Sequence, residues 1–161
     1  MSEQREHGAS DGCVFCGIAA GTVPCERVAE DATTVAFMDI DPGADGHMLV
    51  IPKRHSADLL DIPADDLAAT VLAAQRLARA ALTALGAEGV NLLQCSRSAA
   101  WQTVPHFHLH VIPRHLDRSR DRLELPFEPG RPADAAAIAA HGRAIAAALE
   151  ADRAGEADVR G

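Results

Sequence analysis

The sequence predicts an α+β domain with a mainly antiparallel sheet, one long helix and a C-terminal helix. Several short apolar patterns typical of strands gather around one long helical pattern, instead of alternating with helices as in parallel α/β folds. Residues 41–46 are rich in Asp, Gly and Pro and separate two of these strand patterns, which is typical of a turn. With 161 residues, the chain is long enough for one domain that buries a core.

Each strand is predicted from a short run of apolar residues bounded by turn residues. These runs cover residues 34–39, 47–52, 90–94 and 105–113.

Two segments carry a helical pattern. Residues 62–85 show apolar side chains at helical spacing, and Gly86 is suited to end that helix. Residues 133–151 predict a second helix with an apolar stripe on one face. The charged segment between residues 115 and 132 contains three prolines and predicts an irregular surface loop.

The composition limits the class of protein. We expect a flexible tail over residues 1–11, one domain over 12–151 and a flexible tail over 152–161. A net charge of −8 argues against nucleic acid as a partner, although a locally positive pocket still suits a small anion. No apolar run reaches the roughly 18 residues of a membrane span, and the start lacks the apolar region of a secretory signal, so we expect no membrane partner and a cytoplasmic location.

The most informative motif is a run of three alternating histidines, His106, His108 and His110. The residues between them favour a strand, in which alternate side chains share one face and stand roughly 6.5–7 Å apart. Phe107 and Leu109 then face the core. Three imidazoles on one face predict metal binding, nucleophilic chemistry or both, and the spacing alone does not separate these alternatives.

A second motif is Cys13-x-x-Cys16. A redox pair with this spacing is expected after a strand in a βαβ unit, whereas this one follows a polar tail. As half of a zinc site it needs two more ligands, and histidines at positions 47, 55, 106, 108 and 110 are available. Two buried thiols are the alternative interpretation.

Together these motifs resemble the histidine triad (HIT) family of nucleotide hydrolases and transferases, and in particular its zinc-carrying bacterial, Hint-like branch. The resemblance covers residues 13–114, most of the chain. Its markers are Cys13-Val-Phe-Cys16, Phe37-Met-Asp39-Ile40, Gly46-His47 through Ile51-Pro-Lys-Arg-His55, and Gln102-Thr-Val-Pro-His106-Phe-His108-Leu-His110-Val-Ile-Pro-Arg114.

The resemblance implies a hydrolase in which His108 attacks the α-phosphorus of a nucleotide. A nucleotidyl-histidine intermediate forms and is then hydrolysed by water. The resemblance assigns His110 as a donor to a phosphate oxygen and His47 as a support behind His108. Gln102 and Thr103 are implied as further donors around the developing charge.

The resemblance also implies the binding residues and the assembly. Asp39 is expected to accept hydrogen bonds from the ribose hydroxyls, and the purine cleft is expected to comprise Val14, Phe15, Ile18, Val23, Phe37 and Ile40. The zinc-carrying branch implies Cys13, Cys16, His55 and His106 as ligands of a structural Zn²⁺, because a Cys₂His₂ set is closed. A homodimer is also implied.

Two positions depart from the family pattern. Cys95 stands where Hint-like proteins have an asparagine that helps to bind phosphate, and Trp101 stands where the family usually has glycine. Both departures concern residues that affect the specificity for the leaving group. The leading hypothesis is a nucleotide phosphoramidase or nucleotidyl hydrolase acting on purine nucleotides. The alternatives are a diadenosine-polyphosphate hydrolase or phosphorylase, a nucleotide-binding regulatory module with little catalysis, and a metalloenzyme whose triad holds a catalytic metal.

Overall fold

The computed structural model describes residues 12–124, 130 and 134–159. The chain divides into two compact units, Met1–Leu123 and Glu124–Gly161, and each is described by itself. The predicted extent of one domain over 12–151 stays a prediction. The expected N-terminal tail, 1–11, lies outside the described residues.

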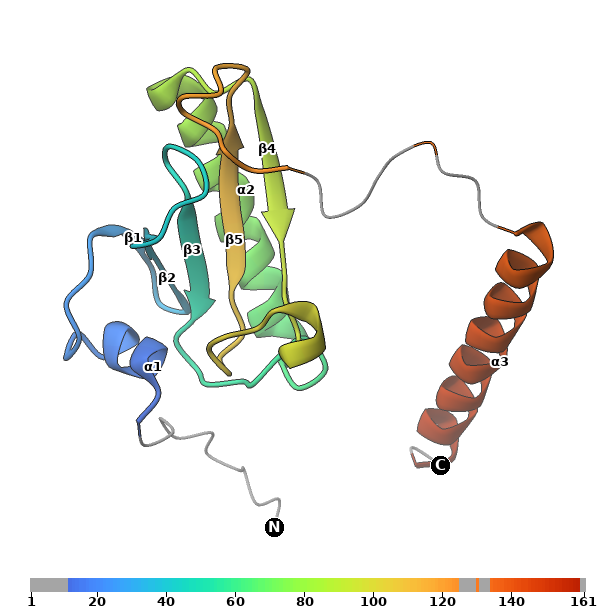
Figure 1. The fold of residues 1–161 in the computed structure, drawn as a ribbon. Coiled ribbons are helices and arrows are strands. Elements are labelled where there is room, and N and C mark those ends of the chain that lie inside the picture. Colours follow the sequence, from blue (N-terminus) through green and yellow to red (C-terminus); the bar gives the residue numbers. More distant parts are fainter. Residues whose placement is uncertain (1–11, 125–129, 131–133, 160–161) are drawn as a thin grey trace, which may run out of the picture. The chain divides into compact units, whose positions relative to one another are not determined.

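A five-stranded sheet forms the first unit, and all neighbouring strands in it run antiparallel (Figure 1). The strand order is β1-β2-β3-β5-β4, so β1 and β4 lie at the edges. The strands are β1 (Arg27–Glu30), β2 (Thr34–Met38), β3 (Met48–Pro52), β4 (Gly89–Leu93) and β5 (Leu109–Arg114). The mainly antiparallel α+β fold is thereby confirmed. Strand β1 was not predicted, because it is short, begins and ends with charged residues and is mostly exposed.

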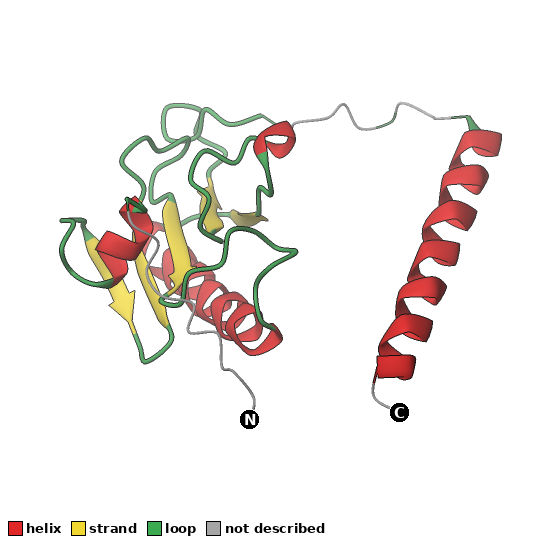
Figure 2. Ribbon diagram, turned by 90° about the horizontal axis from the view of Figure 1, so that it is seen from below, coloured by secondary structure: helices red, strands yellow, loops and turns green. Residues whose placement is uncertain are grey.

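The two faces of the sheet pack against different helices (Figures 1 and 2). The 22-residue helix α2 (Ala64–Leu85) contributes Ala74 and Leu77 to a core with Val50 and Phe107. The short helix α1 (Val14–Ala19) contributes Phe15 and other side chains to a second cluster on β2 and β3. Burial of apolar surface on both faces stabilises the central strands β2 and β3.

The histidine run starts before its strand, since β5 begins only at Leu109. Pro105 has no N–H to donate, and the Phe107 N–H donates to the carbonyl of Ser56 at 2.7 Å, outside the ladder. The predicted alternation of faces is nevertheless confirmed. Phe107 and Leu109 lie in the α2 core, while the rings of His106 and His108 meet Phe15 of α1.

Glycine is required immediately before His47. Gly46 has φ of +82°, and a Cβ there would lie 2.2 Å from Cδ1 of Leu85 at the end of α2. The positive φ favours glycine in this turn, which leads into His47 and then β3.

The predicted irregular loop covers residues 115–132, of which 125–129, 131 and 132 lie outside the described residues. Specific contacts hold its described part before residue 125. His115 and Asp121 are buried, and Asp121 accepts hydrogen bonds from Arg114 and from the N–H groups of His115 and Leu123. Burial alone raises the pKa of Asp121, but these donors outweigh it and lower the pKa to about 2.

In the second unit, helix α3 (Ala135–Val159) continues eight residues past its predicted end, into the segment 152–161 that was expected to be a flexible tail. None of the helices in the described residues combines the length and hydrophobicity needed to span a bilayer.

Candidate active site and metal centre

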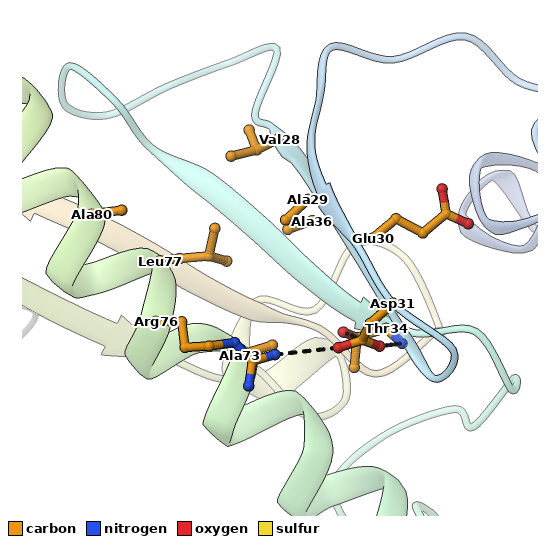
Figure 3. A pocket seen from close by; sticks show the side chains of 10 residues that line it. All are labelled: Val28, Ala29, Glu30, Asp31, Thr34, Ala36, Ala73, Arg76, Leu77 and Ala80. Atoms are coloured by element: carbon orange, nitrogen blue, oxygen red, sulfur yellow. Dashed lines mark hydrogen bonds and ion pairs between the residues drawn. The ribbon is translucent and has the colours of Figure 1, made fainter.

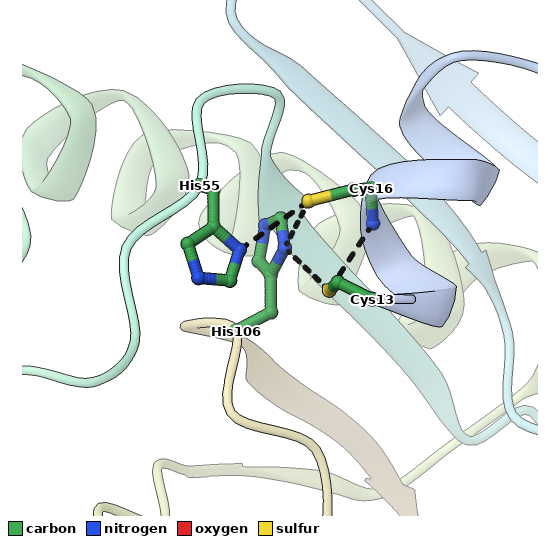
Figure 4. Close-up of side chains that lie close together, drawn as sticks. All are labelled: Cys13, Cys16, His55 and His106. Atoms are coloured by element: carbon green, nitrogen blue, oxygen red, sulfur yellow. Dashed lines mark hydrogen bonds between the residues drawn. The ribbon is translucent and has the colours of Figure 1, made fainter. Parts of the chain in front are cut away.

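Four predicted zinc ligands, distant in sequence, converge at one end of the first unit (Figure 4). Cys13 caps the N-terminus of α1 and Cys16 lies in its first turn, while His55 follows β3. The Sγ atoms of Cys13 and Cys16 each lie 3.5 Å from Nδ1 of His106. Sγ of Cys16 also lies 3.3 Å from Nδ1 of His55.

These four groups fit a zinc ion. Tetrahedral bonds of about 2.3 Å to sulfur and about 2.0 Å to nitrogen place S and N atoms about 3.5 Å apart, close to the separations observed. The Nε2 of His106 lies 2.9 Å from the carbonyl oxygen of Pro52. Because a carbonyl only accepts, His106 carries its proton on Nε2 and directs the Nδ1 lone pair at the thiols. Burial, with a small contribution from His55, lowers the pKa of His106 to about 4, so the ring is neutral as a ligand must be.

The backbone of His106 also orients His108. Nδ1 of His108 lies 2.7 Å from the carbonyl oxygen of His106, so Nδ1–H donates and Nε2 keeps its lone pair. His108 is buried, and burial lowers its pKa, which keeps the ring neutral near pH 7. The ring of Phe15 packs edge-on against it at 5.3 Å. An unprotonated nitrogen held in one tautomer is what a nucleophilic histidine requires.

Asp39, His47 and His110 form a second cluster of possible ligand atoms. His47 Nε2 lies 2.9 Å from Nδ1 of His110 and 3.5 Å from Oδ2 of Asp39. The N–H of Gly43 donates to Nδ1 of His47 at 3.3 Å, so His47 carries its proton on Nε2. That proton is donated to Nδ1 of His110, which leaves the His110 proton on Nε2. Burial, followed by the neighbouring histidines, lowers the pKa of His110 to about 4.

A cleft of about 370 Å³ lies beside the histidines, between α1, β2 and the loop before His106. Small-molecule sites usually have volumes of about 300–1,000 Å³. Ten of the residues singled out in the sequence line this cleft: Val14, Phe15, Ile18, Val23, Phe37, Asp39, Ile40, Thr103, His108 and His110. Further lining residues were not predicted, namely Pro24, Cys25, Met38, Leu49 and Val104. Only their place beside the motifs in the fold identifies them.

Gln102 is not among the residues that line this cleft. Its amide oxygen accepts from the N–H of Arg97 at 2.6 Å, and its amide nitrogen donates to the carbonyls of Ala57 and Val104. The side chain therefore holds together the loop before the triad. Its expected role as a donor to phosphate stays a prediction.

The two departures from the family pattern differ in their surroundings. Cys95 is buried, and burial raises the pKa of its thiol. Trp101 is 66% exposed and has φ of +67°, a left-handed conformation that glycine adopts without strain. This backbone conformation explains why glycine is suited to the position.

A slightly larger cavity, about 420 Å³, lies between β1, β2 and α2 (Figure 3). Alanine, valine and leucine side chains line most of it, and Arg76 pairs with Asp31 at its rim. No histidine or cysteine is among its lining residues, whereas His108 and His110 line the smaller cleft.

The antiparallel fold and the histidine run are those expected of a histidine triad protein, and comparisons with known proteins agree. The family model of the HIT domain matches residues 20–117. The chain therefore belongs to the histidine triad family, and the predicted family is confirmed.

Three similar proteins extend this result. An adenosine 5′-monophosphoramidase of Schizosaccharomyces pombe is 41% identical over 63% of this chain and 74% of its own length. The crystal structure of SMU.412c from Streptococcus mutans has a TM-score of 0.79 at 33% identity and covers 88% of both chains. A zinc-bound histidine triad family protein from Mycobacterium smegmatis has a TM-score of 0.65 at 42% identity, over 72% of this chain and 84% of its own.

Proposed function

We propose that the protein is a nucleotide phosphoramidase that hydrolyses purine nucleotide conjugates at the α-phosphate. One observation carries the proposal: His108 is buried beside the cleft with Nδ1–H bound to the His106 carbonyl, which leaves Nε2 as the available nucleophile. The phosphoramidase named among its relatives supports the same reaction class.

In the proposed reaction, Nε2 of His108 attacks the α-phosphorus and a P–N bond to the histidine forms. The bond from phosphorus to the leaving amine breaks, and the amine leaves with a proton taken from solvent. Water then attacks the same phosphorus and gives a proton back to solvent as the bond to His108 breaks. A nucleoside monophosphate and neutral His108 are released. The histidine makes one difficult displacement into two easier ones.

The remaining side chains support binding and charge stabilisation. Asp39 lines the cleft, where its Oδ1 accepts from the N–H of Asp41 and its Oδ2 lies 3.5 Å from Nε2 of His47. Each carboxylate oxygen has two lone pairs, so Asp39 keeps acceptor capacity for ribose hydroxyls. Nε2–H of His110 donates to a phosphate oxygen, because His47 occupies the other ring nitrogen. Phe15 and Phe37 offer aromatic surface to a purine.

Cys13, Cys16, His55 and His106 are proposed to hold a structural Zn²⁺, which joins α1 to the histidine run when bound. The thiols must stay reduced to bind it, which fits the reducing cytoplasm.

A homodimer is proposed through the edge strand β4. No strand among the described residues pairs with its outer edge, and Leu92 and Leu93 of this strand are exposed. The nearby helix α2 exposes Leu72 and Leu82 as well. Joining β4 to a second copy would pair the strand edge and bury these side chains.

The proposal is tested with His108→Ala and adenosine 5′-phosphoramidate. We expect turnover to fall by at least about 10³-fold, because the covalent route is lost. Zinc content and thermal unfolding should stay close to wild type, since His108 is not a ligand. Turnover within tenfold of wild type would overturn the proposal. Product analysis with a dinucleoside polyphosphate, with and without inorganic phosphate, distinguishes the hydrolase and phosphorylase alternatives.

A further inference from the structure

We propose that the metal centre and the nucleotide cleft are thermodynamically coupled, with His106 and Phe15 as the positioning residues that connect them. The inference rests on the proposed function, because the ligand of the cleft is taken to be a nucleoside monophosphate. The metal ligands come from α1, the segment after β3 and the segment before β5. Two of these segments also supply cleft residues.

The first connection runs through His106. Its Nδ1 faces both thiols, its Nε2–H donates to Pro52, and its carbonyl accepts from Nδ1–H of His108. The side chain of one residue is thus a metal ligand while its backbone fixes the tautomer of the nucleophile. Because the ring and the carbonyl belong to one residue, a metal ion that holds the ring also restrains the backbone that accepts the 2.7 Å hydrogen bond from His108.

The second connection runs through α1. This helix has only six residues, too few to be stable by itself, so its position depends on what holds it. Cys13 and Cys16 are on its metal side, while Val14, Phe15 and Ile18 line the cleft. Phe15 touches both His106 and His108, with ring centroids at 6.0 and 5.3 Å. Metal binding therefore orders the same helix that a purine contacts.

The ordering of α1 and His106 links the binding of zinc to the binding of the nucleotide. If zinc binding orders α1 and His106, a nucleotide that binds afterwards loses less conformational freedom. By linkage, the nucleotide must raise the affinity for zinc by the same factor by which zinc raises the affinity for the nucleotide. Such coupling factors are commonly about 5- to 150-fold, which corresponds to about 1–3 kcal/mol.

The deciding experiment measures the zinc affinity of the zinc-loaded protein by competition with a chromogenic chelator, with and without saturating AMP. We expect AMP to raise zinc affinity by at least about fivefold. Equal zinc affinities, in a protein that calorimetry shows to bind AMP, would overturn the inference. A protein that binds no AMP would instead contradict the proposed function, so the two failures are distinguishable.

Two variants locate the coupling. Phe15→Leu keeps an apolar side chain and all four ligands but loses the aromatic contact with His108. We expect it to hold one zinc per chain and to show a smaller AMP effect on zinc affinity. The matched control is Ile40→Ala, because Ile40 lines the cleft with its side chain 99% exposed and lies on no ligand-bearing segment. The AMP effect should survive in the control at saturating AMP, and equal loss in both variants would contradict the role of Phe15.

The His106 connection has its own readout that involves no nucleotide. In ¹H–¹⁵N spectra of the imidazoles, Nδ1–H of His108 should be protected from exchange in the zinc-loaded protein. His55→Ala weakens the metal site without touching the cleft, and we expect that protection to fall at least about tenfold. His55→Cys restores a fourth ligand and should restore the protection. Unchanged protection in a His55→Ala protein that has lost its zinc would overturn this part of the inference.

Discussion

The two groups of converging donor atoms differ in the backbone groups behind them. His106 in the Cys₂His₂ centre has a carbonyl, that of Pro52, behind its second nitrogen. His47 in the cluster with Asp39 and His110 has an N–H, that of Gly43, in the same place. A carbonyl leaves the opposite nitrogen as a lone pair, whereas an N–H leaves it protonated.

The comparison shows that converging donor atoms do not by themselves make a metal site. The His106 arrangement presents a lone pair to two thiols and suits a metal ion. The His47 arrangement presents a proton to His110, so it suits a relay that leaves His110 able to donate to phosphate. This argues against the alternative in which the triad holds a catalytic metal.

The largest expected effect comes from breaking the metal centre. Cys16→Ala removes one of the four proposed zinc ligands and weakens the attachment of α1 to the histidine run. A structural zinc ion contributes directly to folding. We expect loss of stoichiometric zinc and a decrease in melting temperature of at least about 10 °C, measured by metal analysis and calorimetry. A variant that melts like wild type would show that the centre does not stabilise the fold.

A substitution in the cluster of Asp39, His47 and His110 should reduce turnover without loss of zinc. His47→Ala removes the donor that fixes His110, so turnover should fall roughly 10- to 10³-fold. The zinc content should stay at one per chain, because His47 is not one of the four proposed zinc ligands. Zinc titration of the wild-type protein, followed by calorimetry, should likewise show no second tight site. A second equivalent that is lost in His47→Ala would refute the distinction between the clusters.

The pH dependence of stability sharpens the same contrast. Burial first, and then the charges of the neighbouring histidines, lower the pKa of His110 to about 4, against about 6.5 in the unfolded chain. Between pH 6.5 and pH 4 the unfolded state binds more protons than the folded state. The contribution of neutral His110 to the unfolding free energy is therefore fully present above pH 6.5 and is lost as the pH falls toward 4. From pH 7.5 to 5, the wild type should lose roughly 1–2 kcal/mol more unfolding free energy than His110→Asn. Urea unfolding at both pH values measures this, and parallel losses would contradict it.

The smallest expected effect is at Trp101, which belongs to neither cluster. A left-handed backbone costs a non-glycine residue about 1–2 kcal/mol, and glycine gives back part of this through unfolded-state entropy. Trp101→Gly should raise the unfolding free energy by less than about 1 kcal/mol and leave zinc content unchanged. Urea unfolding tests this, and a clear destabilisation would reveal a packing contact of the indole.

The periodic strands and the long helix could be predicted from the sequence, whereas the exposed edge strand β1 and the contacts of the loop after β5 could not. The order of the strands' apolar patterns and the long helix were sufficient for the fold class, because hydrophobic periodicity reports which faces are buried. Strand β1 was missed because an exposed edge strand carries little periodicity. His115 begins the segment for which the sequence predicts an irregular surface loop, yet the contacts around Asp121 bury it.

By itself, the sequence determined the histidine triad motif, the alternation of its faces, and the set of cysteines and histidines available as ligands. These follow from local periodicity, residue chemistry and the family resemblance. Only the tertiary structure decided which nitrogen of each histidine carries the proton. That choice depends on the Pro52 carbonyl and the Gly43 N–H, and every residue type has such a carbonyl, while all but proline have such an N–H. Their positions, and so the separate roles of His47 and His106, exist only once β3, its flanking turn and the histidine run lie side by side.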